Sequence, residues 1–306
     1  MIAESLAGKR IAITGSTGFV GTALVERMLR SVPDCELVLL VRDGKRTPAA
    51  KRTQKEILKN NAFDRLRESH GAPDATETFA EMTDRRITTI AGDVSRDGLD
   101  LNDTDRAIFA SCSTVIHSAA AVSFDSPLNS AVEINLLGPV RIAELCNQLE
   151  ITPHIVAVST CYVAGNRRGR APEELVSEGP WDIGLDWRNE VASARRLKGD
   201  TEAISRTRDN LERFRKEARG ELGAAGAPAL AAKTEQLRER WVRAELVDAG
   251  RSRAASLGWP DAYAYTKALG EQALTEVKGP VPVSIVRPSI IESAWAEPNP
   301  GWIRGF

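Results

Sequence analysis

Short apolar runs alternate with amphipathic stretches along the first half of the chain, and one more run follows near its end. The apolar runs predict strands at residues 9–14, 35–42, 86–94, 112–120, 154–160 and 282–291. The run CELVLLVR at 35–42 is almost continuously apolar, as expected for a parallel strand buried on both faces. Helical stretches at about 50–69 and 132–149 separate some of the strands. This rhythm predicts βαβ units and an α/β fold, a Rossmann-like doubly wound parallel sheet.

A long charged segment between Asp186 and Gly258 interrupts the rhythm. Its apolar residues keep helical spacing in two runs, formed by Ile204, Leu211, Phe214 and Ala218 and by Leu230, Leu237, Trp241 and Ala244. Gly223, Gly226 and Pro228 separate the runs, so a helical hairpin is predicted. The hairpin is either a solvated lid or packing element, or a surface that contacts an acyl chain, a carrier protein or a membrane.

From the predicted strands and the insertion, we expect the chain to be divided into three parts. Residues 1–185 are expected to form the first part of a Rossmann domain, 186–258 the helical insertion, and 259–306 a helix and strand that belong to the same domain. The chain stops at NPGWIRGF directly after a strand-like segment, without a closing helix or a polar tail. We therefore expect a fragment of a longer protein.

Composition narrows the class of protein. The 306 residues are 42% hydrophobic and 27% charged, which is typical of a soluble globular protein. The net charge of -1 favours neither nucleic acid nor a strongly acidic partner. The four cysteines and three histidines are scattered, so we expect no disulfide framework and no metal site, and a cytoplasmic location. The first residues contain no signal peptide or transmembrane run, which leaves peripheral membrane contact open.

A glycine-rich loop, GSTGFVG at 15–21, lies between the first predicted strand and a helix. Its glycines let the backbone turn tightly and bring a pyrophosphate to the helix N-terminus, where free N–H groups and the helix dipole favour anions. The loop therefore predicts a dinucleotide-binding site. Its candidate contact residues are Gly15, Thr17, Gly18, Phe19, Val20 and Gly21.

The end of the second strand distinguishes NAD from NADP. An acidic residue there would bind the ribose 2′-hydroxyl, whereas a guanidinium suits a 2′-phosphate. Arg42 holds this position in LLVRDGKR, and Lys45 and Arg46 follow it. Asp43 is the alternative, as an NAD-type acid placed one residue late. We expect NADPH.

Tyr263 and Lys267, in WPDAYAYTKALGEQAL, lie four residues apart and share a face if the segment is helical. Tyr265 points away from Lys267 by about 200° of helical rotation, so it is expected to be a packing or pocket residue. The pair follows a strand that ends in the hydroxyl residues Ser159 and Thr160. GxxGxxG spacing, a strand-end hydroxyl and a YxxxK pair together resemble the extended short-chain dehydrogenase/reductase superfamily.

That resemblance implies catalytic roles. Lys267 would bind the nicotinamide ribose and lower the pKa of Tyr263, which would donate a proton to a carbonyl oxygen as hydride arrives. Thr160, matched to the superfamily pattern, would hydrogen-bond the developing oxyanion, with Ser159 as the reserve candidate.

The same resemblance implies further positions around the cofactor. These are Asp93 and Val94 in a turn that binds adenine, Ser118, Ala119 and Ala120 beside the nicotinamide, and Arg287 and Pro288 over its carboxamide. Asn135 resembles a helix asparagine that braces the site. For His117, a hydrogen bond at a strand end is at least as good an interpretation as a catalytic role.

Six segments occur in one order along the chain: TGSTGFVGTALVERML, NNAFDRLRE, ITTIAGDVSRDGLDLND, VSTCYVAG, YAYTKALGE and VRPSIIESAWAEPNPGWIRGF. Together they resemble the fatty acyl-CoA reductase family of the male sterility type, and the long insertion is closer to its bacterial members. The resemblance implies NADPH-dependent reduction of a long-chain fatty acyl-CoA to an aldehyde, an alcohol or both, with release of coenzyme A. It also implies an N-terminal portion truncated before the substrate-binding region.

Three other functions stay open. One is reduction of a thioester held by a carrier protein, and another is oxidoreduction of a sugar nucleotide or steroid by a different extended short-chain dehydrogenase. The third is a non-catalytic NADP-binding regulator, although the complete set of Thr160, Tyr263 and Lys267 argues against it. The sequence pattern does not specify acyl chain length or oligomeric state.

Overall fold

The computed structural model describes residues 2–179, 184–223 and 226–304, which group into two units. The sheet unit consists of Met1–Ala120, Ile134–Cys161 and Ala273–Phe306, and the helical unit of Ala121–Glu133 and Tyr162–Gln272. The ranges 1–185, 186–258 and 259–306 expected from the sequence divide the chain differently, because 121–133, 162–185 and 259–272 group with the inserted helices. Residues 1, 180–183, 224–225 and 305–306 of those ranges lie outside the described residues.

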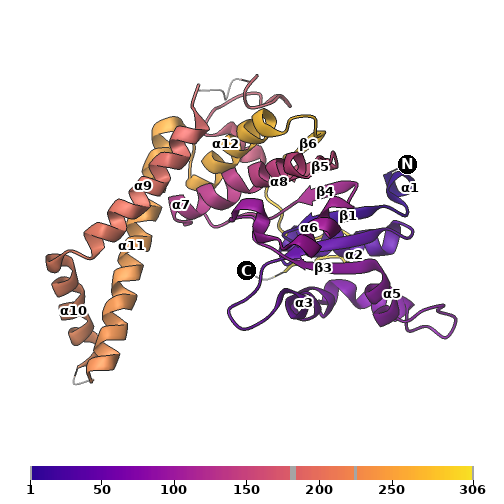
Figure 1. The fold of residues 1–306 in the computed structure, drawn as a ribbon, viewed down its shortest axis with the longest axis horizontal. Helices are drawn as coiled ribbons and strands as arrows, with labels where there is room; N and C mark the ends of the chain where they lie inside the picture. Colours follow the sequence, from indigo (N-terminus) through magenta and orange to yellow (C-terminus); the bar gives the residue numbers. More distant parts are fainter. Residues whose placement is uncertain (1, 180–183, 224–225, 305–306) are drawn as a thin grey trace. The chain divides into compact units, whose positions relative to one another are not determined.

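Each of the predicted strands forms, and all of them pair in parallel within the sheet unit (Figure 1). They are β1 Arg10–Thr14, β2 Glu36–Val41, β3 Ile87–Ala91, β4 Thr114–His117, β5 His154–Val158 and β6 Val283–Val286. Their order in the sheet is β3-β2-β1-β4-β5-β6, so the chain crosses to the other half of the sheet after β3. This order confirms the predicted doubly wound α/β fold.

One helix of the sheet unit precedes β1, and the others connect its strands. These helices are α1 Ile2–Leu6, α2 Phe19–Ser31, α3 Ala49–Arg52, α4 Asp64–Ser69, α5 Phe79–Arg86, α6 Asp103–Ala110 and α8 Leu137–Gln148. Segments of π-helix are η1 Thr53–Leu58 and η4 Val132–Leu136, and segments of 3₁₀-helix are η2 Asn61–Phe63, η3 Asp97–Asp100 and η5 Cys161–Ala164. The helix predicted at 50–69 is divided at Asn60, whose extended backbone stops one segment and whose side chain accepts the Ala62 N–H at 2.9 Å to start the next.

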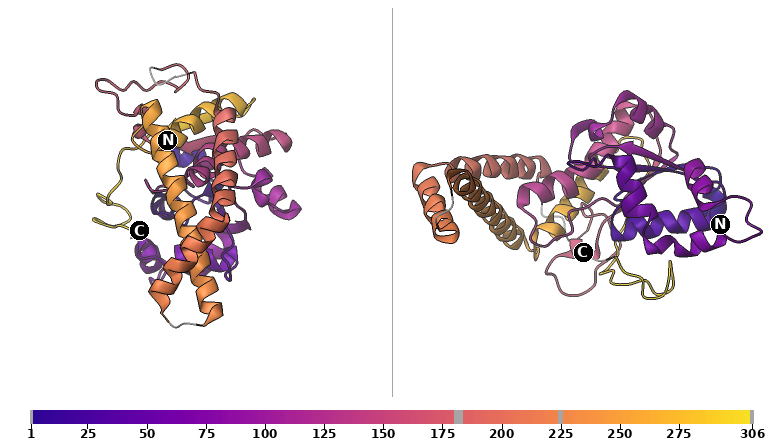
Figure 2. Two further views of the ribbon diagram at one scale, coloured as in Figure 1. Left: turned by 90° about the vertical axis from the view of Figure 1, so that its left-hand side faces the viewer. Right: turned by 90° about the horizontal axis from the view of Figure 1, so that it is seen from below.

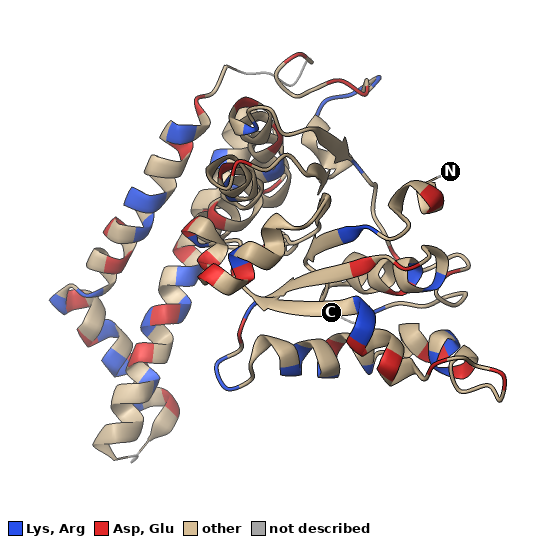
Figure 3. Ribbon diagram, turned by 45° about the vertical axis from the view of Figure 1, so that its right-hand side comes forward, with Lys and Arg blue, Asp and Glu red and all other residues tan. Residues whose placement is uncertain are grey.

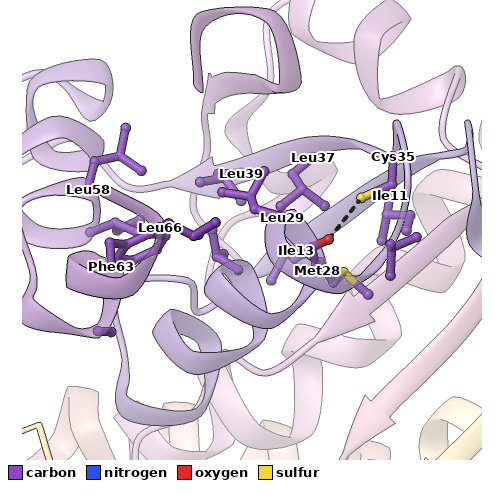
Figure 4. Packing of buried hydrophobic residues seen from close by; sticks show 14 of the residues in the cluster. Ile11, Ile13, Met28, Leu29, Cys35, Leu37, Leu39, Leu58, Phe63 and Leu66 are labelled. Atoms are coloured by element: carbon purple, nitrogen blue, oxygen red, sulfur yellow. Dashed lines mark hydrogen bonds between the residues drawn. The ribbon is translucent and has the colours of Figure 1, made fainter. Parts of the chain in front are cut away.

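Successive residues of β1 face opposite sides of the sheet, as the period of a strand requires. Ile11 and Ile13 pack with Met28 and Leu29 of α2 in the cluster drawn in Figure 4. Ala12 belongs to a second cluster, which includes side chains of α6 and α8. Both faces of the sheet are therefore covered by apolar side chains, and each large side chain that is fully buried contributes roughly 1.5–3 kcal/mol to folding.

The helical unit contains α7 Leu128–Ala131, α9 Trp187–Ser205, α10 Arg208–Leu222, α11 Ala227–Leu257 and the part of α12 (Ala262–Val277) that ends at Gln272. Both views of Figure 2 show α9 and α10 packed along the single long helix α11. The first arm of the predicted hairpin is therefore divided into two helices. The division arises because the side chains of Thr207 and Asn210 both donate to the carbonyl oxygen of Ile204, at 2.9 and 2.8 Å, and so end α9.

The inserted helices pack through a small apolar cluster and expose charge. Phe214 and Ala218 of α10 contact Leu237 of α11, and the Trp241 ring lies 6.0 Å from that of Phe214. Basic and acidic residues are interspersed along these helices (Figure 3). Within the described ranges, no helix combines the length and the apolar character needed to cross a membrane.

Candidate active site

Only glycine fits at two positions of the 15–21 loop. Gly15 has a positive φ of +73°, and a Cβ on it would lie 2.5 Å from the backbone nitrogen of Ala119. A Cβ on Gly21 would lie 2.2 Å from the carbonyl oxygen of Gly15. The loop therefore packs against the residues that follow β4 on one side and against the first turn of α2 on the other.

The N-terminus of α2 has the properties of an anion-binding site. Its N-cap residue, Gly18, provides no side chain to accept the exposed N–H groups of the first turn. In the same loop the Ser16 hydroxyl is buried, at 1% exposure, and has no hydrogen-bond partner among the described residues. Because buried hydroxyls are almost always hydrogen-bonded, the loop fits a ligand with several acceptor oxygens, such as the pyrophosphate of a dinucleotide.

Arg42 lies directly after β2 and is exposed. Its side chain is 64% exposed, and Nη1 lies 3.7 Å from the carboxylate of Asp93. The Asp93 carboxylate also accepts hydrogen bonds from the backbone and the hydroxyl of Ser95, at 2.9 and 2.7 Å. Asp43 instead accepts the N–H of Ala49 at 2.7 Å, at the start of α3. The guanidinium of Arg42 is therefore better placed than the Asp43 carboxylate to meet a ligand.

His117 ends β4 and is buried, at 1% exposure. Its Nδ1 is hydrogen-bonded to the Thr14 hydroxyl at 2.8 Å, and the hydroxyl oxygen accepts the Ala119 N–H at 3.2 Å. A Cβ on Gly138 of α8 would lie 3.5 Å from the imidazole. These contacts agree with the interpretation of His117 as a hydrogen-bonded strand-end residue. Asn135, in η4, is also 1% exposed.

Ser159 and Thr160 follow β5. Their backbone is fixed because the hydrogen bonding between β5 and β6 continues past the ends of both strands. The N–H of Ser159 donates to the Val286 carbonyl at 2.7 Å, and the N–H of Cys161 donates to the Pro288 carbonyl at 2.9 Å. Thr160 lies between these two bonds, and Ser159 and Thr160 are 5% and 4% exposed. Their side chains are thus attached to a rigid backbone at the carboxyl edge of the sheet, where α/β proteins bind ligands.

Tyr263 and Lys267 lie in the first turns of α12, within the helical unit. The Asp261 carboxylate accepts the Ala264 N–H at 2.8 Å and so supports the helix start. The Phe124 ring meets the Tyr263 ring edge-on, with centroids 6.3 Å apart. Burial lowers the pKa of Lys267 to about 8, although Glu271 raises it in part.

The structure identifies site neighbours that the sequence did not reveal. Tyr265 is buried, as its helical position predicts, but its hydroxyl also donates to the Glu190 carboxylate, which Arg253 binds as well. Glu190 is 75 residues away from Tyr265 and 63 from Arg253, and Phe124 is still farther from Tyr263 along the sequence. Pairs this far apart leave no periodic signal in a single sequence.

The predicted site residues fall in both units. Those in the sheet unit are Gly15, Thr17, Gly18, Phe19, Val20, Gly21, Arg42, Asp93, Val94, His117, Ser118, Ala119, Ala120, Asn135, Ser159, Thr160 and Pro288. Tyr263 and Lys267 are in the helical unit. In the described part of the chain, no group of three His, Cys, Asp or Glu side chains is arranged to hold a metal ion.

Sequence comparisons point to one family. An NAD-binding family model described as "Male sterility protein" matches residues 13–306. "Fatty acyl-CoA reductase 2, chloroplastic" from Arabidopsis thaliana is 31% identical over 99% of this chain and 45% of its own length. "Alcohol-forming fatty acyl-CoA reductase" from Simmondsia chinensis is 33% identical over 99% of this chain and 56% of its own length. The chain thus spans about half the length of these relatives.

A solved structure shares the fold. The terminal R domain from the myxalamid PKS-NRPS biosynthetic pathway superposes with a TM-score of 0.53 and 20% sequence identity. The superposition covers 94% of this chain and 50% of that one. At this identity the similarity supports the Rossmann-type architecture alone.

Proposed function

Because the chain belongs to the male sterility family of NAD(P)-binding reductases, within the extended short-chain dehydrogenase/reductase superfamily, we propose that it reduces long-chain fatty acyl-CoA with NADPH. The observation that carries the proposal is the match over residues 13–306, which includes both the glycine loop and the YxxxK pair. The products would be a fatty aldehyde, a fatty alcohol or both, together with coenzyme A. Four free thiols fit a reducing compartment, so we place the reaction in the cytoplasm.

We propose a separate catalytic role for each of Tyr263, Lys267 and Thr160. A bound nicotinamide would supply hydride to the carbonyl carbon of the thioester. Tyr263 would donate its phenolic proton to the carbonyl oxygen, and Lys267, charged below pH 8, would lower the pKa of Tyr263. The Thr160 hydroxyl, with Ser159 in reserve, would hydrogen-bond the same oxygen. The resulting hemithioacetal would release coenzyme A as a thiol and leave an aldehyde. A second NADPH would supply the hydride that reduces the aldehyde to an alcohol, with the same hydroxyl groups bound to its oxygen.

The choice of NADPH rests on the strand end after β2. Arg42 offers a planar guanidinium for a 2′-phosphate, and the neighbouring Lys45 and Arg46 are exposed. Asp43, the alternative NAD-type acid, is engaged with the backbone of α3.

Around the rest of the cofactor we propose the contacts implied by the family pattern. They are Asp93 and Val94 at the adenine, Ser118, Ala119 and Ala120 beside the nicotinamide, Pro288 over its carboxamide, and Asn135 and His117 as supporting residues.

The proposal is tested by product analysis. The purified chain is incubated with NADPH and palmitoyl-CoA, a palmitoyl carrier protein, or a sugar nucleotide. We expect hexadecanal or hexadecanol from palmitoyl-CoA. Tyr263→Phe is expected to lower turnover more than about 100-fold while the dissociation constant of NADPH stays within about twofold.

Tyr162→Phe is the matched control, because it removes the same hydroxyl outside the YxxxK pair. Turnover of a sugar nucleotide alone would overturn the proposed substrate. Full activity in Tyr263→Phe would overturn the catalytic assignment.

A further inference from the structure

The side of α12 opposite Lys267 is attached to the inserted helices through Tyr265. This side chain is 1% exposed, and its ring packs 5.9 Å from that of Trp259. Its hydroxyl donates a hydrogen bond to Oε2 of Glu190 in α9. Tyr265 comes two residues after Tyr263, so the two phenols leave the helix in directions about 200° apart.

Glu190 also binds α11. The Nε of Arg253 in α11 donates to Oε2 at 3.0 Å, and the Nη2 of Arg253 donates to Oε1. Both carboxylate oxygens are therefore used, in the bidentate geometry that fixes a guanidinium and a carboxylate most firmly. Burial raises the pKa of Glu190, but the hydrogen bonds from Arg253 and Tyr265 outweigh it and hold that pKa below its usual value. The carboxylate therefore stays ionised at neutral pH.

The residues just before α12 are attached to the segment that follows β5. The indole N–H of Trp259 donates to the Val163 carbonyl at 2.9 Å, and the Asn166 N–H donates to the Gly258 carbonyl at 2.8 Å. All of these contacts lie within the helical unit. The N-terminal half of α12 is thus held at its start and along the side that carries Tyr265.

The bonds that hold α12 on the side of Tyr265 limit rotation of the helix, and so fix the direction of Tyr263 on its opposite side. Side chains extend roughly 5–6 Å from a helix axis, so a 20° rotation of α12 would move a phenol on its surface by about 2 Å. A displacement of about 1 Å from the productive geometry can lower a rate by about 100-fold. A contact that prevents rotation therefore matters for a proton donor even when it does not touch the substrate.

We propose that Glu190, together with Arg253 and Tyr265, positions Tyr263, so that the inserted helices α9 and α11 set the orientation of the proton donor. This proposal depends on the proposed function in one respect, namely that Tyr263 is the proton donor. It assigns the insertion a part in catalysis rather than only in packing.

A second bridge between the same helices provides a matched comparison. Arg238 of α11 is 3% exposed and donates to Glu202 and Ser205 of α9, at 2.8 Å in each case. It also joins α9 to α11 through a guanidinium and a carboxylate, here with Nη1 alone as the donor to Glu202, and it involves no residue of α12. A purely structural role for ion pairs in the insertion predicts similar effects from both bridges.

The test observes Tyr263 without relying on turnover. The chain contains three tyrosines, so uniform labelling with 3-fluorotyrosine gives three ¹⁹F resonances. Tyr162→Phe and Tyr263→Phe assign them by the resonance that each variant loses. We expect Glu190→Gln to shift and broaden the Tyr263 resonance in the protein with and without NADPH. Glu202→Gln, the control, is expected to leave that resonance within its original linewidth.

Kinetics provide the second measurement. Glu190→Gln is expected to lower kcat about 10-fold while the KM for palmitoyl-CoA and the NADPH dissociation constant stay within about twofold. Glu202→Gln is expected to keep kcat within about twofold of the unmodified chain. If Glu190→Gln does not fold cooperatively, Arg253→Lys is used in its place in both measurements. This substitution keeps the positive charge but removes the bidentate contact with Glu190.

The outcomes separate the two proposals. An unchanged Tyr263 resonance in folded Glu190→Gln overturns the positioning role, as does an equal change in Glu202→Gln. A chain that reduces none of the substrates but shows the expected ¹⁹F change retains the positioning role and loses the proposed function.

Discussion

The hydroxyl of Thr14 is hydrogen-bonded to Nδ1 of His117 at 2.8 Å, and the two residues are register partners at the carboxyl ends of β1 and β4. The same oxygen accepts the N–H of Ala119 at 3.2 Å. One buried side chain therefore joins the strand before the glycine loop to the loop after β4.

Replacing Thr14 with valine keeps the shape of the side chain and removes both bonds. Because the His117 ring and the Ala119 N–H lose a partner, we expect Thr14→Val to lower the free energy of unfolding by about 1–3 kcal/mol. NADPH binding is expected to weaken as well, since Ala119 loses its bond to the Thr14 side chain and only the Ser118 N–H, which donates to the Thr14 carbonyl, remains bonded to β1. Urea unfolding and fluorescence titration measure the two effects. Thr88→Val on β3 is the control, and an equal effect there would contradict the argument.

Arg42→Ala is expected to weaken binding of NADPH selectively. Loss of a charge-assisted bond to the 2′-phosphate should raise the NADPH dissociation constant by about 10- to 100-fold, whereas that of NADH should change less than about twofold. Titration of both nucleotides against the chain measures the ratio. Arg65→Ala, which removes an exposed arginine from α4, is the control. Equal weakening of both nucleotides would show that Arg42 does not bind the 2′-phosphate.

Two glycine substitutions should have opposite effects. In Gly21→Ala the new methyl group would meet the Gly15 carbonyl oxygen at 2.2 Å, so we expect a loss of more than about 3 kcal/mol in stability and of dinucleotide binding. Gly220 lies inside α10, and a Cβ on it would have nothing within 4 Å, so Gly220→Ala should stabilise the chain by about 0.5–1 kcal/mol. Thermal and urea unfolding of both variants test the pair. Stability in Gly21→Ala equal to that of the parent would refute the close packing of the loop.

Lys267 predicts a pH dependence of stability. The pKa of the Lys267 ammonium is about 8 in the folded chain, whereas the usual pKa of a lysine, 10.5, applies in the unfolded chain. Between pH 8 and pH 10.5 the unfolded chain therefore binds more protons than the folded chain. The free energy of unfolding therefore rises with pH across this window. Lys267→Met, which cannot be charged, should gain about 3 kcal/mol over the parent at pH 7 and only about 1 kcal/mol at pH 10. A gain that does not change with pH would contradict the lowered pKa. Lys51→Met, at an exposed position, is the control.

The sheet was predictable because its physical cause is local. A strand such as β2 is buried on both faces, with Leu37 and Val38 on opposite sides and both fully buried, so its sequence is continuously apolar. The glycine loop was predictable for a related reason, since Gly15 and Gly21 occupy positions that other residues cannot.

The break between α9 and α10 and the bonds of Glu190 depend on specific polar contacts, which the spacing of apolar residues in the sequence does not predict. The break between α9 and α10 depends on two side chains that compete for the carbonyl of Ile204. The bonds of Glu190 to Tyr265 and Arg253 join residues on three different helices. Apolar spacing predicts which face of a helix is buried, but not which polar groups meet there.

The pairing of β6 with β5 has a consequence for how the chain folds. The side chains of His154 and Ser284 on these strands are hydrogen-bonded although they are 130 residues apart. Closing so long a loop carries an entropic cost, and contacts of high sequence separation slow folding. During synthesis the last strand of the sheet emerges only after α9, α10 and α11, whose mutual contacts are much closer in sequence. The inserted helices can therefore fold first, and β6 joins the sheet only after α9, α10 and α11 have been synthesised.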